Sequence, residues 1–255
     1  MASDAYKQAV AAIRTQVREV ARRLFLANGS WRDADLEQFV ERFVPLMLAA
    51  ETRIALLTSR DIERELTELF GTARPISIDT AAVTGSALRN ADPNEVYARA
   101  YHEVWYRLAE GDELNLAVRK ATERLDKMVL SDLQLAKTHT YREALQQDGR
   151  APAFERVLTG AENCSLCVVA STQRYHRSNL LPIHPGCDCD VRPLAVDTGE
   201  QIINHDRLNE VEAQLFEDFG ETPSSEKNLL RNIMVRDHPE IGPYLQQRGH
   251  SFKRL

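Results

Sequence analysis

Glycine and proline are scarce in this chain, with 11 and 10 residues among 255, and aromatic residues make up only 7%. Sandwiches and barrels need many tight turns, so this scarcity argues against them and favours long helices. No segment approaches the ~20 apolar residues of a membrane span. The N-terminal segment has no basic stretch followed by an apolar one, so we expect no secretory signal and synthesis in a reducing cytoplasm.

An excess of basic residues is also missing, because the formal net charge is −6. A general nucleic-acid binder needs clustered Lys and Arg for its phosphate contacts, so this class is disfavoured. The sequence contains no GxSxG, HExxH or P-loop GxxxxGK motif, and no GxGxxG after a predicted strand. We therefore expect no enzymatic activity, no catalytic residue and no small-molecule substrate.

Amphipathic segments with helical spacing fill the first half of the chain. Ser3 is placed to cap a helix over 3–27, which ends at Asn28-Gly29. Apolar residues recur along it at spacings of three and four and predict a seam for another helix, formed by Tyr6, Val10, Ile13, Val17, Val20 and Leu24. We expect this seam to pack against other helices of the same chain. The alternative is a partner protein, for which helix 3–27 would be a docking arm.

A second helix is expected from Asp33 or Asp35, kinked or divided at Pro45 because a proline ring displaces a helical hydrogen bond. A further amphipathic segment reaches Gly71. Residues 72–91 are rich in Thr, Ser and Ala, which predicts an irregular connector or short strands. The expected inward residues of the second helix are Leu36, Phe39, Val40, Phe43, Leu46, Met47, Ala50, Ile54 and Leu57.

Asp92 and Pro93 mark a third helix start, since Asp caps a helix and Pro suits its first turn. Gly111 closes this helix and another follows. After Ser131 we expect a separate helix that runs to about Gln147. The buried stripe expected after Asp92 is Val96, Tyr97, Ala100, Tyr101, Val104, Trp105 and Leu108.

The cysteines are concentrated between residues 154 and 193, as Cys164, Cys167, Cys187 and Cys189. Two close pairs predict four thiolates at one point rather than cysteines scattered through a core. Zinc is the expected metal, because it takes tetrahedral thiolate and imidazole ligands. Two disulfides or a redox pair are the alternatives. A reducing cytoplasm disfavours the disulfides, and the lack of a βαβ pattern disfavours the redox pair.

His184 lies three residues before Cys187 and is an alternative ligand in a Cys3His site. We expect it instead beside the ligands, where a hydrogen bond from its ring would orient one of them. Four protein ligands leave no position for water, so a structural zinc is expected rather than a hydrolytic one. A segment of about forty residues buries too little surface to fold without such a metal.

The same segment resembles a known family. CSLC, a spacer ending in LLPIHPGCDCDVRPL and the preceding LAKTHTYREAL are similar to the MuF-like phage head morphogenesis proteins, also called minor capsid proteins. The actinobacteriophage branch is the most similar, and RDHPEIGPYL resembles a motif near the end of those proteins. The resemblance covers about 132–194, with a weaker likeness over about 230–253.

This resemblance implies a structural minor protein of the virion, built into the phage head interior during assembly or acting in genome packaging and ejection. Its implied partners are the portal and/or the major capsid protein, with packaged DNA as a further contact and no membrane. A capsid maturation protease component is a weaker alternative, because the chain has no spare length for a protease domain. The competing class is a zinc-knuckle module that binds nucleic acid. In it, Arg174, Tyr175 and Arg177 set two cations around an aromatic ring on an exposed loop between the two cysteine pairs.

The expected fold is mainly α. An N-terminal helical bundle is followed by a small α+β, cysteine-rich segment of the MuF type, similar to a zinc knuckle, and by a short helical C-terminal region. The corresponding domains are 1–79, 80–196 and 197–255, the last a helical or extended tail that packs back onto the body.

Overall fold

The computed structural model describes residues 3–27, 29–157, 174–176, 189–196, 233–240 and 242–247. The fold is mainly helical, as expected. Its helices are α1 (Asp4–Leu26), α2 (Asp33–Phe70), α3 (Ser86–Arg89), α4 (Pro93–Ala109) and α5 (Leu114–Asp148), with a 3-10 turn η1 (Thr80–Ala82). Its strands are β1 (Ala153–Val157), β2 (Arg174–His176), β3 (Asp190–Leu194), β4 (Ile233–His238) and β5 (Gly242–Gln247).

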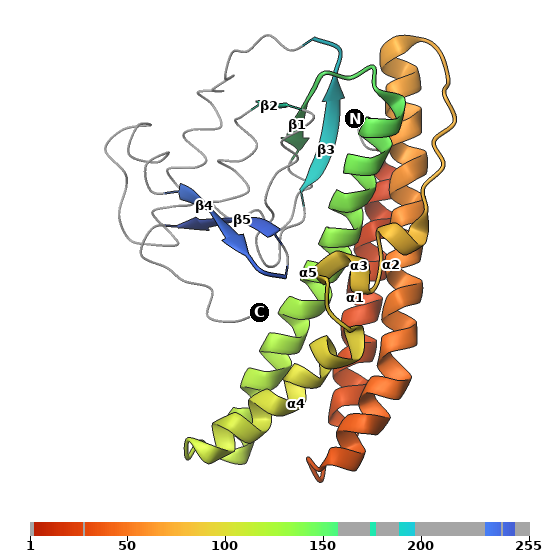
Figure 1. Cartoon of the computed structure of the whole chain (residues 1–255). Helices are drawn as coiled ribbons and strands as arrows, with labels where there is room; N and C mark the ends of the chain where they lie inside the picture. The colour runs from red at the N-terminus through yellow and green to blue at the C-terminus, as the bar shows by residue number, and fades with distance from the viewer. Residues whose placement is uncertain are drawn as a thin grey trace.

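Three long helices form the body of the molecule (Figure 1). α1 runs antiparallel to α5, since Tyr6 near the start of α1 hydrogen-bonds Tyr141, and Arg22 near its end pairs with Asp126. It also runs antiparallel to α2, because Tyr6 contacts Thr58 and Phe25 contacts Phe39. α4 packs against α2 and the first half of α5. Among the described residues, no helix is both long and apolar enough to cross a membrane.

The predicted helix starts are confirmed. The Ser3 hydroxyl oxygen accepts a hydrogen bond from the Tyr6 N–H at 3.2 Å, and the Asp92 carboxylate accepts one from the Asn94 N–H at 2.8 Å, with Pro93 in the first turn of α4. These side chains satisfy N–H groups that have no partner within the helix. Gly71 ends α2 with a φ of 71°, a left-handed conformation that glycine adopts without steric cost.

Pro45 does not divide the second helix, so the expected division is wrong. α2 runs through it for 38 residues, about 57 Å. The backbone loses one hydrogen bond at Pro45, but Phe43, Val44 and Met47 on both sides of it are buried, and their packing keeps the chain helical through the proline. Leu46 was expected to point inward and is 49% exposed, because the buried face follows its neighbours at helical spacing.

The break expected at Ser131 is also absent. α5 is one helix of 35 residues, and its sequence contains no glycine or proline. Ser131 itself is buried inside the bundle, so the serine does not act as a cap here. Leu108 of α4 was expected in the core but is 39% exposed near the end of that helix.

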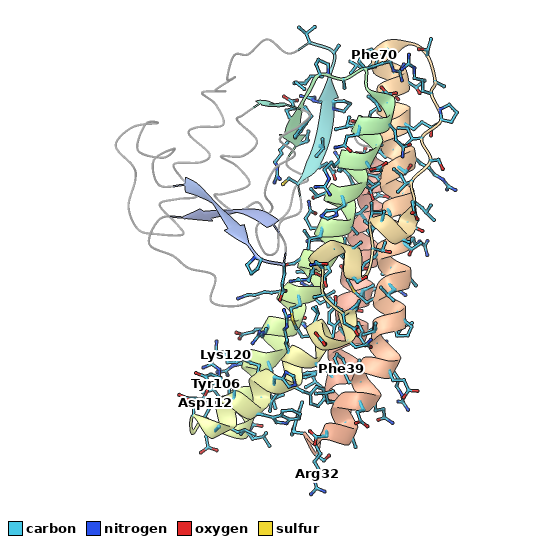
Figure 2. All side chains as sticks on the ribbon, viewed as in Figure 1. Arg32, Phe39, Phe70, Tyr106, Asp112 and Lys120 are labelled. Carbon is cyan, nitrogen blue, oxygen red and sulfur yellow. The ribbon has the colours of Figure 1, made fainter. Side chains whose placement is uncertain are left out.

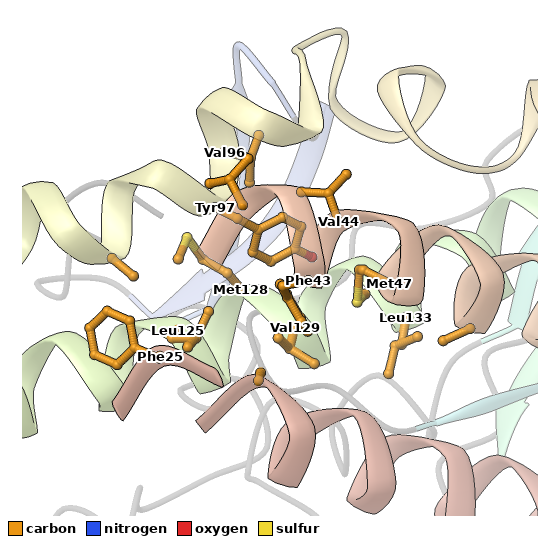
Figure 3. Close-up of a cluster of buried hydrophobic side chains, with 14 of the residues drawn as sticks. Phe25, Phe43, Val44, Met47, Val96, Tyr97, Leu125, Met128, Val129 and Leu133 are labelled. Atoms are coloured by element: carbon orange, nitrogen blue, oxygen red, sulfur yellow. The ribbon is translucent and has the colours of Figure 1, made fainter. Parts of the chain in front are cut away.

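The main core is shared by α1, α2, α4 and α5 (Figure 3). Phe25 of α1 meets Phe39 of α2 and Tyr101 of α4, with ring centroids 5.7 and 5.1 Å away. Figure 2 shows Phe39 within this packed region and Arg32 at the outer end of the α1–α2 turn. Helices from both sides of the predicted boundary at residue 79 therefore pack into a single core.

Helix α1 is an element of this core. The predicted seam is confirmed at Tyr6, Val10 and Ile13, which are buried, while Ala21 and Phe25 complete the buried face near the other end. The docking-arm alternative is corrected, because the apolar face of α1 is covered by α2 and α5 of the same chain.

A small antiparallel sheet lies against the C-terminal ends of α2 and α5 (Figure 1). Its strand order is β2-β1-β3, and β3 contacts α2 directly. Phe154 of β1 and Val191 of β3 face the helices and form a second core with Ile62, Leu66, Tyr141, Ala144, Leu145 and Ala151. This second core fixes the strands that flank the cysteine-rich segment.

The tail was expected to be helical or extended, and the part of it that the structure describes is extended, while residues 197–232 lie outside the described residues. Its described part is a β-hairpin in which β4 pairs with β5, from Ile233 opposite Gln247 to His238 opposite Gly242. The expectation of a tail that packs back onto the body is confirmed by Glu240 in the hairpin turn, which pairs with Arg99 of α4.

Candidate functional site

The sheet register places the end of β1, which precedes the first cysteine pair in the sequence, beside the start of β3, which follows the second pair. Val157, the last residue of β1, lies opposite Asp190, the first residue of β3. The chain leaves β1 there toward Cys164 and Cys167 and enters β3 directly after Cys187-Asp188-Cys189. Of these cysteines the structure describes Cys189, while Cys164, Cys167, Cys187 and the alternative ligand His184 lie outside the described residues.

Cys189 is buried at the foot of β3, and both its sulfur and its main chain are held. The Arg156 Nη1 group donates a hydrogen bond to the Cys189 Sγ at 3.2 Å, and the Gln134 side-chain amide donates one to the Cys189 carbonyl oxygen at 3.0 Å. Arg156 and Gln134 are themselves buried. Within the described ranges, no group of three or more His, Cys, Asp or Glu side chains is arranged to hold a metal ion.

A buried ion pair lies next to Cys189. The Lys137 ammonium donates to the Asp190 carboxylate at 2.9 Å, and the side chains of both residues are 2% exposed. The hydroxyl of Tyr141 lies 3.5 Å from the same carboxylate oxygen and 3.3 Å from the hydroxyl of Tyr6. Burial raises the pKa of Tyr6 and of Tyr141, so both hydroxyls stay protonated and available as donors. This chain of polar groups ties β3 to α5 and α1.

A second buried polar cluster lies midway along the bundle. The Arg89 Nε group donates to Asp132 at 2.5 Å, and the Tyr97 hydroxyl donates to the other carboxylate oxygen at 2.7 Å. Glu51 of α2 lies beside them and accepts the Gly85 N–H at 2.8 Å. Burial, followed by the charge of Asp132, raises the pKa of Glu51 to about 8, so this carboxyl is largely protonated at neutral pH.

The C-terminal hairpin joins this cluster through Glu240. Its two carboxylate oxygens accept hydrogen bonds from the Arg99 guanidinium at 2.8 and 2.7 Å, and the Arg89 Nη1 lies 3.6 Å away. Paired two-point contacts of this kind fix orientation as well as charge. The hairpin turn is therefore oriented against α4 and the short helix α3.

The nucleic-acid alternative rested on Arg174, Tyr175 and Arg177, which were expected in an exposed loop. Arg174 and Tyr175 instead belong to β2, an edge strand of the sheet, where Tyr175 lies opposite Phe154 of β1. Arg177 lies outside the described residues. The loop prediction is therefore wrong for the first two of these residues.

The residues that hold Cys189 were not singled out from the sequence. Lys137 lies four residues from both Leu133 and Tyr141, so it occupies the apolar face of α5, and a charge on such a face is a signal for a buried partner. Arg156 follows Phe154 by two residues and shares its side of the strand. No comparable signal marks Gln134, whose role depends on where β3 docks.

Comparison with known proteins gives one match. No curated protein and no solved structure matches the chain. A family model described as VG15 protein, which represents a phage-type viral protein family, matches residues 1–211. The matched range contains the helical bundle, the sheet β2-β1-β3 and all four cysteines. Because the match covers well over half of its length, the chain belongs to the VG15 protein family.

Proposed function

We propose that this chain is a structural minor capsid protein of the phage head, of the MuF-like type. The observation that carries the proposal is the match to a phage-type viral family across the helical bundle and the cysteine segment together. The motifs CSLC and HPGCDC, within the same range, supply the narrower resemblance to head morphogenesis proteins. The protein acts through assembly in the head interior, with the portal or the major capsid protein as partner, and it catalyses nothing.

We further propose that the cysteine segment binds one structural zinc ion through Cys164, Cys167, Cys187 and Cys189. The surroundings of Cys189 fit a metal thiolate, because a buried guanidinium donates a hydrogen bond to its sulfur and would stabilise the negative charge. The register that joins the end of β1 to the start of β3 supports convergence of the two pairs. Zinc would supply a closed cross-link that holds the segment folded.

Incorporation into particles tests the assembly role. The protein carrying an epitope tag is expressed during infection by its phage, heads are purified, and their proteins are identified by mass spectrometry. We expect the tagged chain in DNA-free and DNA-filled heads, and we expect it to co-purify with the portal or major capsid protein after nuclease treatment. Heads that lack the chain would refute the proposal.

Metal content tests the zinc site on the same protein. Purified chain should contain one zinc per molecule, and replacing Cys164 and Cys167 by Ser should remove it. Mass spectrometry that finds two native disulfides in place of a metal would overturn the zinc proposal and leave the assembly role standing.

Nucleic-acid binding is the second candidate, favoured by the position of Arg174 and Tyr175 on the edge strand β2. Proteins that bind single strands combine aromatic side chains, on which bases stack, with cations that contact phosphates. Affinity for single-stranded and duplex DNA, measured between 50 and 200 mM salt, distinguishes the two functions. A steep fall in affinity with salt would favour DNA binding, since it reports released counterions.

A further inference from the structure

We infer that Arg156 is a positioning residue for Cys189, which holds the cysteine sulfur in the direction that a metal requires. The inference rests on the proposed zinc site and deepens it, because it assigns a role to a residue that carries none of the cysteine motifs. Its basis is the 3.2 Å hydrogen bond from the Arg156 Nη1 group to the Cys189 Sγ inside the protein.

The position of Arg156 follows from the pleat of β1. Phe154 and Arg156 share the face that turns toward the helices, while Glu155 between them is less buried. Arg156 lies opposite Val191 in the register and is only 4% exposed, so its guanidinium remains within the protein. A buried cation is costly unless it meets negative charge, and the sulfur of a thiolate supplies such charge at hydrogen-bonding distance.

The main chain around Cys189 is held independently of its sulfur. Gln134 donates to the Cys189 carbonyl oxygen, and Lys137, one turn further along α5, pairs with Asp190. Helix α5 therefore fixes the backbone at Cys189 and Asp190, and β1 fixes the sulfur of Cys189 through Arg156. The sulfur is oriented before other ligands arrive, which lowers the entropy lost when the metal binds.

A donor that contacts a ligating thiolate acts on the metal through that thiolate. It restricts rotation of the side chain and stabilises the charge that remains on the sulfur, and loss of such a partner typically lowers metal affinity about 10- to 100-fold. Arg156 touches no metal ion in this scheme. Its effect is transmitted by Cys189.

The test compares Arg156→Met with Arg192→Met in the full-length chain. Arg192 lies on the neighbouring strand β3, pairs with Glu155 and is 41% exposed, so its replacement removes a guanidinium from the same sheet but not from the sulfur. Zinc affinity is measured by competition with a chromophoric chelator. We expect Arg156→Met to bind zinc about 10- to 100-fold more weakly than wild type, and we expect Arg192→Met to match wild type.

Cobalt provides a readout that a purely structural role would not move. The thiolate-to-cobalt charge-transfer band of the Co²⁺-loaded protein should shift to lower energy in Arg156→Met, because the sulfur loses a hydrogen bond that stabilised its electrons. Arg192→Met should keep the wild-type band. Arg156→Lys retains the positive charge but not the planar guanidinium with its several N–H donors. Its zinc affinity should lie between those of wild type and Arg156→Met.

The outcomes separate this inference from the zinc site itself. If wild type binds neither Zn²⁺ nor Co²⁺, both the zinc proposal and the role of Arg156 are refuted. If wild type binds zinc and Arg156→Met binds it equally well with an unshifted cobalt band, only the role of Arg156 is refuted. Should Arg156→Met lose its helical circular dichroism, Arg156→Lys decides, and wild-type affinity with an unshifted band in that variant refutes the inference.

Discussion

The buried carboxyl of Glu51 predicts how stability depends on pH. Glu51 is 2% exposed on α2, and its pKa rises from 4.5 to about 8 because of burial and the nearby Asp132. Between these two pH values the folded protein keeps the proton while the unfolded chain has lost it, so unfolding releases a proton. The stabilising effect of this proton is complete below pH 4.5 and is lost as pH rises toward 8.

The magnitude follows from the width of this window. One pH unit corresponds to about 1.4 kcal/mol for a single proton, so the contribution of Glu51 across the window is at most about 5 kcal/mol. The glutamine variant Glu51→Gln keeps the side-chain volume and an oxygen that can accept the Gly85 N–H, but it cannot ionise. It should therefore gain stability relative to wild type as pH rises, less the cost of its amide N–H groups among buried neighbours.

The assay is urea unfolding followed by circular dichroism at pH 5, 6, 7 and 8. The difference in the free energy of unfolding between Glu51→Gln and wild type should grow by several kcal/mol from pH 5 to pH 8. Glu68→Gln is the matched control, because that carboxylate is 59% exposed at its pair with Arg64. It should stay parallel to wild type throughout. A difference between Glu51→Gln and wild type that does not change with pH would refute the reasoning.

Three further predictions concern the core, a buried charge and the metal. Phe25→Ala should lower the free energy of unfolding by about 3–5 kcal/mol, whereas Leu46→Ala on the exposed face of α2 should lower it by less than about 1 kcal/mol in urea titrations. Asp132→Asn should cost about 3–5 kcal/mol by the same measurement, because a buried guanidinium loses its carboxylate partner. Cys187→Ser, or chelation of zinc, should speed proteolysis within 154–193 first and leave the helical circular dichroism largely intact; simultaneous loss of both signals would contradict this order.

The helix starts and the connector were predictable because they depend on neighbouring residues. Ser3 and Asp92 each bond an N–H group two or three positions away, and Gly71 needs only its own backbone freedom to end α2. The irregular stretch at 72–91 follows from its own composition and contains only η1 and the short helix α3. Such features require no knowledge of the rest of the fold.

A division at Pro45 and a new helix after Ser131 were predicted, but α2 and α5 continue through these residues. Local rules disfavour a proline within a helix by about 3 kcal/mol, but buried side chains on both sides of Pro45 together contribute more than that. A serine acts as a cap only where a helix starts, and Ser131 is buried in the middle of α5. Tertiary packing therefore keeps α2 continuous at Pro45 and α5 continuous at Ser131, although local sequence rules favour an interruption at both positions.

The sequence by itself determined the helical class, the helix caps and the cysteine spacing, since each is set by residues within a few positions of one another. Only the tertiary structure decided that α1 is covered by its own chain, and that Arg156, Gln134 and Lys137 surround Cys189 and Asp190. These contacts join residues more than thirty positions apart. A buried charge is stable only where such a distant partner arrives, so its role depends on how the strands dock on the helices.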